Sequence, residues 1–162
     1  MTPSRSSAAH APAAMVFSTA LGIDAPATEV MTACVLNLHG NAVTISRALW
    51  DAGVRDATQL HDEIRRLRTV RRLNFGVVYP CSFHHVQMRE WLRSGGIDPE
   101  RDVRIVVVPP AQMYRNLAAG TIDGCCVGEP WSSLAVARGA GCVVTWSAEQ
   151  FPQHIEKVLM VR

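Results

Sequence analysis

The feature that most constrains this chain is a repeated alternation of short, apolar runs with helix-like segments of about ten residues. The runs are rich in β-branched residues and end at Gly, Pro or His-Gly turns, which is typical of strands buried on both faces. We expect strands over residues 31–38, 73–79, 103–108, 122–127, 142–146 and 158–161. The pattern predicts an α/β fold with a mostly parallel sheet that helices cover on both faces.

The segments between these runs carry helix signals. The stripe of Leu60, Ile64 and Leu67 predicts a helix over about 57–70, and Gly95-Gly96 ends another over 82–93. Asn41 is the expected N-cap of a helix that stops at Gly53. Further helices are expected over 13–21, 111–119 and 130–139.

The length of 162 residues allows one domain or one lobe of a larger protein, and the 48% of apolar residues suffices for a core. Residues 1–12 are rich in Ser, Ala and Pro without periodicity, so we expect a flexible lead-in there.

Charge and motifs exclude several function classes. A formal charge of +2 gives no strong field for nucleic acid, so no direct nucleic-acid partner is expected. No apolar stretch is long enough to span a membrane, and the N-terminus makes a poor secretory signal. We therefore expect a cytoplasmic protein, or a periplasmic one if a leader lies upstream of this chain.

The sequence shows no obvious machinery for catalysis. Five cysteines occur without a C-x-x-C spacing, which favours reduced thiols over a metal site. The dinucleotide, P-loop, zinc-protease and nucleophile-elbow motifs are absent. We expect no cofactor, no metal, no catalytic residue and no enzymatic activity.

The turn after the strand at 73–79 is the most informative candidate site, because ligands of α/β sheets bind beyond the carboxyl ends of strands. Pro80-Cys-Ser-Phe-His-His85 places Ser82 and His84 at a helix N-terminus, which outlines a site for a small anion. In the alternative interpretation, Ser82 only caps the helix and the histidines are solvated or satisfied within the core.

Lys157 is a second candidate, since it is the one Lys beside fifteen Arg. A Lys retained in such a chain suggests a site that needs a compact point charge rather than a planar guanidinium. Chance retention at an exposed strand edge is the alternative.

Five segments together resemble a known family. They are Val35–Val43; Tyr79–His84 with Arg89-x-Trp-Leu92 and Gly95–Pro99; Val106–Met113; Gly120–Trp131; and His154–Val158 ending at Met160-Val-Arg162. The sequence resembles the nitrate/bicarbonate-binding family of periplasmic-binding-protein-like solute receptors, whose members serve ABC importers or act as cytoplasmic nitrate/nitrite sensors.

The resemblance implies a type II periplasmic-binding-protein fold, in which two α/β lobes joined by crossing strands close on a ligand. It implies that this chain holds one complete lobe and only a piece of the other. Residues 13–40 would be a fragment of the first lobe with a crossing strand, 41–127 the ligand-binding second lobe, and 128–162 a crossing segment and return strand.

The resemblance also implies roles for individual residues. His84 would contact the anion, Asn41 would occupy a polar amide position and Lys157 would supply the cation, with Ser82 beside them. The expected function is a cytoplasmic sensor of nitrate or nitrite whose partner is an RNA-binding antiterminator protein.

Two alternatives remain open. One is a periplasmic receptor that delivers nitrate, bicarbonate or another small anion to an ABC permease. The other is a small α/β enzyme that uses Cys81 or His84. A partial lobe would expose apolar surface, so self-association is a further expectation.

Overall fold

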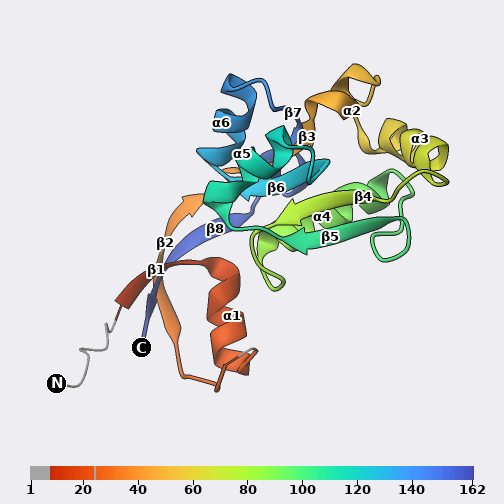
Figure 1. Cartoon of the computed structure of the whole chain (residues 1–162). Coiled ribbons are helices and arrows are strands. Elements are labelled where there is room, and N and C mark those ends of the chain that lie inside the picture. The colour runs from red at the N-terminus through yellow and green to blue at the C-terminus, as the bar shows by residue number, and fades with distance from the viewer. Residues whose placement is uncertain (1–7, 24) are drawn as a thin grey trace.

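The structure, a computed structural model, describes residues 8–23 and 25–162 and contains two sheets joined by long strands (Figure 1). The strands are β1 (Ala8–Pro12), β2 (Met31–Leu38), β3 (Asn41–Ser46), β4 (Leu73–Val77), β5 (Val103–Val107), β6 (Gly124–Gly128), β7 (Gly141–Trp146) and β8 (Ile155–Val161). The helices are α1 (Ala13–Leu21), α2 (Arg47–Asp51), α3 (Ala57–Leu67), α4 (Phe83–Ser94), α5 (Pro110–Ala118), α6 (Trp131–Ala137) and α7 (Ser147–Gln150).

The smaller sheet has the order β1-β8-β2, and α1 lies beside it (Figure 1). Strand β8 pairs antiparallel with both β1 and β2. In the pairing with β1, Ala8 lies opposite Val161 and Pro12 lies opposite Lys157. The expectation of a flexible lead-in is therefore wrong for residues 8–12, because their backbone groups pair with β8. Residues 1–7 of that lead-in lie outside the described residues.

The larger sheet is mixed, with the order β5-β4-β6-β3-β7. Strand β4 runs parallel to β5 and β6, whereas β3 runs antiparallel to β6 and β7. The α/β class and the mostly parallel sheet are confirmed, because β7 runs antiparallel to β3 and therefore in the same direction as β4, β5 and β6. Of these five strands, β3 alone runs the other way. Because β7 is an edge of this sheet, the larger lobe also continues beyond the expected boundary at residue 127.

The expectation of a helix from Asn41 to Gly53 is wrong for residues 41–46, which form strand β3. All six residues of β3 are buried, and its two neighbouring strands satisfy its backbone groups. The helix begins only at Arg47, where the side chain of Ser46 accepts a hydrogen bond from the amide of Leu49. Tertiary pairing thus overrides the helical spacing of the apolar residues.

Helices cover both faces of the larger sheet, as predicted. Helices α3 and α4 pack on the face that carries Phe75 and Cys126, while α5 and α6 pack on the face that carries Cys125 and Val127. The carboxyl ends of β4 and β6 and the start of β3 share the end of the sheet that adjoins the smaller sheet (Figure 1).

Candidate functional site

The predicted turn after β4 faces the smaller sheet across a pocket of about 380 Å³. Tyr79, Cys81, Ser82 and His84 line it from the turn and the start of α4, and Ser18 and Thr19 are among the residues that line it from α1. The pocket therefore lies between elements of the two sheets. The described lining does not include Lys157.

Ser82 occupies the N-cap position of α4. Its hydroxyl donates to the carbonyl oxygen of Tyr79 at 2.6 Å and accepts from the amide of His85 at 3.3 Å. Because the hydroxyl proton is already donated, Ser82 shapes the turn and does not present a free donor to the pocket.

His84 is the least satisfied polar side chain of the site. It is 6% exposed, and neither Nδ1 nor Nε2 has a hydrogen-bond partner among the described residues. Burial lowers the pKa of His84 to about 4, so the ring is neutral at pH 7 and carries one N–H donor. A buried donor without a partner is costly, and a bound ligand or water would satisfy it.

Asn41, the first residue of β3, lies near His84 but does not line this pocket. Its Nδ2 donates to Glu156 Oε2 at 2.7 Å, whereas its Oδ1 has no partner among the described residues. A Cβ atom at Gly128 would lie 3.2 Å from Asn41 Oδ1 and 3.7 Å from His84 Nε2. Both side chains therefore lie against Gly128, where a larger residue would crowd Asn41.

Glu156 connects Asn41 to Lys157. Its Oε2 also accepts from His154 Nε2 at 2.8 Å, and its Oε1 accepts from Lys157 Nζ. Burial raises the pKa of Glu156, but hydrogen bonds from Lys157 and His154 outweigh burial and hold the pKa below its ordinary value. The carboxylate is ionised at neutral pH and neutralises Lys157, which is 25% exposed.

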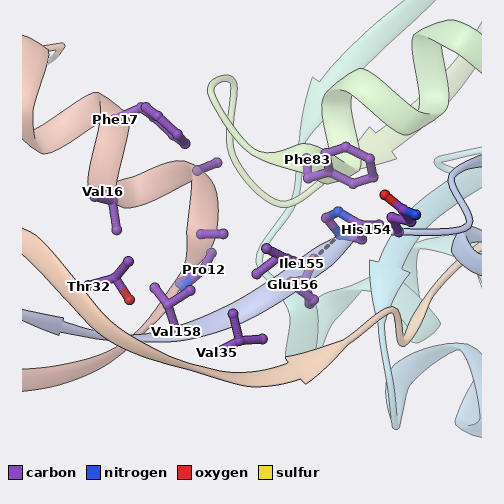
Figure 2. A pocket seen from close by; sticks show the side chains of 13 residues that line it. Pro12, Val16, Phe17, Thr32, Val35, Phe83, His154, Ile155, Glu156 and Val158 are labelled. Carbon is purple, nitrogen blue, oxygen red and sulfur yellow. Dashed lines mark hydrogen bonds and ion pairs between the residues drawn. The ribbon is translucent and has the colours of Figure 1, made fainter.

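His154 links this network to α4. Its ring stacks on Phe83 with the centroids 3.5 Å apart and an interplanar angle of 14°. Figure 2 shows both side chains at a second pocket, of about 490 Å³, together with the bond from His154 to Glu156. Apolar side chains of α1, including Val16 and Phe17, form the opposite wall of this pocket.

The structure thus brings His84 and Asn41 together and ties Lys157 to them through Glu156. Sequence reasoning missed Glu156 and His154. In the segment His154–Val158 the resemblance assigns a role to Lys157 alone, and a carboxylate runs against the charge expected of an anion site. The available signal was the alternation along β8, which buries Glu156 and Val158 on one face.

Residues 8–23 and 25–162 contain neither a candidate metal site nor a candidate membrane span. No group of three or more His, Cys, Asp or Glu side chains there could hold a metal ion. None of the helices in that part of the chain is long and apolar enough to cross a membrane.

Comparisons with known proteins agree on one family. The chain is 41% identical over 133 residues to the nitrate/nitrite binding protein NrtA of Synechococcus elongatus, covering 78% of this chain and 29% of that protein. It is 39% identical over 158 residues to the bicarbonate transport ATP-binding protein CmpC of Synechocystis sp., covering 95% of this chain and 23% of that protein.

A solved structure supports the same conclusion. The crystal structure of the periplasmic nitrate-binding protein NrtA from Synechocystis superposes with a TM-score of 0.87 at 28% identity, covering 96% of this chain and 40% of that one. This confirms the periplasmic-binding-protein fold that the resemblance implied. The chain spans 19% to 31% of the length of the curated relatives it matches. Residues 5–162 match the NMT1-like family, and the chain belongs to it.

Proposed function

We propose that this chain forms part of the ligand-binding cleft of a periplasmic receptor for an ABC importer, and that it binds a small monovalent oxyanion. Nitrate is the first candidate, with nitrite and bicarbonate as close alternatives. The observation that carries the proposal is His84, whose buried imidazole at the N-terminus of a twelve-residue helix has no hydrogen-bond partner in the part of the chain that the structure describes.

The chemistry of the site suits a small anion. The N–H of His84 and the ammonium group of Lys157 are donors to oxygen, and hydrogen bonds to charged groups contribute roughly 1.5–3 kcal/mol each. Two or three such bonds, together with cleft closure, suffice for a free energy of about −8 kcal/mol, which corresponds to micromolar affinity.

The comparisons favour the importer over the expected cytoplasmic sensor. The solved relative is described as periplasmic, and the curated relatives are named for binding or transport of nitrate, nitrite or bicarbonate. None of these descriptions includes an antiterminator, so an ABC permease replaces it as the expected partner. Since this chain has no P-loop, relatives named as ATP-binding bring no nucleotide site to it.

A binding role also fits better than the enzyme that uses Cys81 or His84. A nucleophilic thiol needs a hydrogen bond to its base, but neither nitrogen of His84 bonds to Cys81 or to any other described residue. The relatives are named as binding and transport proteins, which supports a binding role at the level of the family.

Calorimetric titration of the chain with nitrate, nitrite and bicarbonate at pH 7 tests this function. We expect micromolar binding of at least one anion. His84→Leu and Lys157→Ala should each weaken that binding at least tenfold, because each removes a donor. His61→Leu, a matched change on α3, should leave it unchanged. Absence of binding for all three anions would refute the proposal.

A further inference from the structure

An ionised carboxylate stands inside the network that the proposed function assigns to an anion. Glu156 is 4% exposed and accepts hydrogen bonds from Asn41, His154 and Lys157. Asn41, one of its donors, lies beside Gly128, as does His84. The carboxylate of Glu156 therefore bonds to a residue that neighbours His84, whose imidazole has no hydrogen-bond partner among the described residues.

The charges of the network sum to zero before any ligand binds. Lys157 contributes one positive charge, and Glu156 contributes one negative charge. Burial lowers the pKa values of both His84 and His154, so both rings are neutral at pH 7. Among the described residues of the network, the charge of Lys157 is thus already balanced.

We propose that Glu156 is a specificity-determining residue that admits singly charged oxyanions and rejects doubly charged ones such as sulfate. This inference rests on the proposed function and names the charge class of its ligand. We refer to this role of Glu156 as the charge filter.

The charges around the ligand explain why a monoanion would be preferred over a dianion. The network is largely buried, so water screens its charges poorly, and Coulomb energy scales with the charge on the ligand. A monoanion can draw on the Lys157 ammonium and on neutral donors while Glu156 stays hydrogen-bonded. A dianion meets twice the repulsion from Glu156, and its second charge finds no further cation among the described residues of the network.

The variant Glu156→Gln isolates this charge. It keeps the shape of the side chain and an oxygen acceptor for Asn41, but it removes the negative charge. Both anions should gain affinity, and a dianion should gain more because the lost repulsion scales with its charge. The matched control is Glu90→Gln, which removes an equal charge from an exposed ion pair with Arg93 on α4.

The experiment is calorimetric titration of the full chain with sodium nitrate and sodium sulfate at pH 7. In Glu156→Gln, the affinity for sulfate relative to nitrate should rise at least tenfold above wild type, and Glu90→Gln should not change it. An unchanged ratio in folded Glu156→Gln would overturn the charge filter. If the wild type fails to bind nitrate, nitrate is lost as the first candidate of the proposed function. The charge filter is still tested in that case, because it requires Glu156→Gln to bind sulfate more tightly than the wild type does.

A second measurement needs no variant and covers the case in which Glu156→Gln does not fold. Perchlorate and sulfate share a tetrahedral shape and differ in charge. Wild type should bind perchlorate at least tenfold more tightly than sulfate. A wild type that shows no preference for perchlorate would overturn the filter, whatever its affinity for nitrate.

Discussion

His84 couples the candidate site to the stability of the fold. Burial lowers its pKa from 6.5 to about 4, so between these values the unfolded chain binds more protons than the folded one. The free energy of unfolding should therefore fall as the pH drops from about 6.5 towards 4, by roughly 3 kcal/mol in total. Urea unfolding at pH 7 and pH 5 measures this loss. His84→Leu should lose less stability over the same interval, and an equal loss in both proteins would contradict the assignment.

The individual site residues differ in how far sequence could place them. His84 was accessible because a strand-turn-helix pattern fixes the position of a helix N-terminus. The resemblance assigns Asn41 to a polar position, even though the local pattern predicts a helix where the structure has strand β3. Glu156 was out of reach, since its ionised state depends on Asn41, His154 and Lys157, which tertiary contacts bring together.

Among the elements, strand β6 is tightly packed at Gly124, which pairs with Ile45 of β3 and Phe75 of β4. A Cβ atom there would lie 2.7 Å from the ring of Phe75 and 3.0 Å from the carbonyl oxygen of Thr44. Gly124→Ala should therefore reduce the free energy of unfolding by roughly 1–3 kcal/mol. Gly76→Ala on β4 is the matched control, because its Cβ would meet the ends of flexible side chains, those of Met113 and Ile122. Chemical denaturation should give a lower free energy of unfolding for Gly124→Ala than for Gly76→Ala. The reverse order would contradict this account.

The elements also show what periodicity can and cannot predict. Continuous apolar runs identified buried strands, because burial on both faces removes the polar alternation. The antiparallel strand β3 between β6 and β7 is not among the predicted strands, because the pattern favours a helix over its residues. The run at Asn41–Ser46 was also compatible with a helix, since a short apolar stretch fits both periods.

At the scale of the whole molecule, the smaller sheet leaves much apolar surface uncovered. All eight residues of β2 are exposed, and Phe17 and Leu21 on α1 are 69% and 72% exposed. An exposed edge strand beside apolar side chains favours pairing with another chain.

We therefore expect this chain to self-associate as its concentration rises, which multi-angle light scattering can measure. The double change Phe17→Ser and Leu21→Ser should shift the distribution towards monomer, because it removes apolar area next to β2. Val70→Ser is the control, since Val70 is 76% exposed but lies beyond α3, away from the smaller sheet. If exposed apolar area alone drove association, the control would act in proportion to its area. If the α1 double variant shifts towards monomer and Val70→Ser does not, the contact between copies lies on the smaller sheet. A chain that stays monomeric at every concentration would show that this surface does not pair with a second copy.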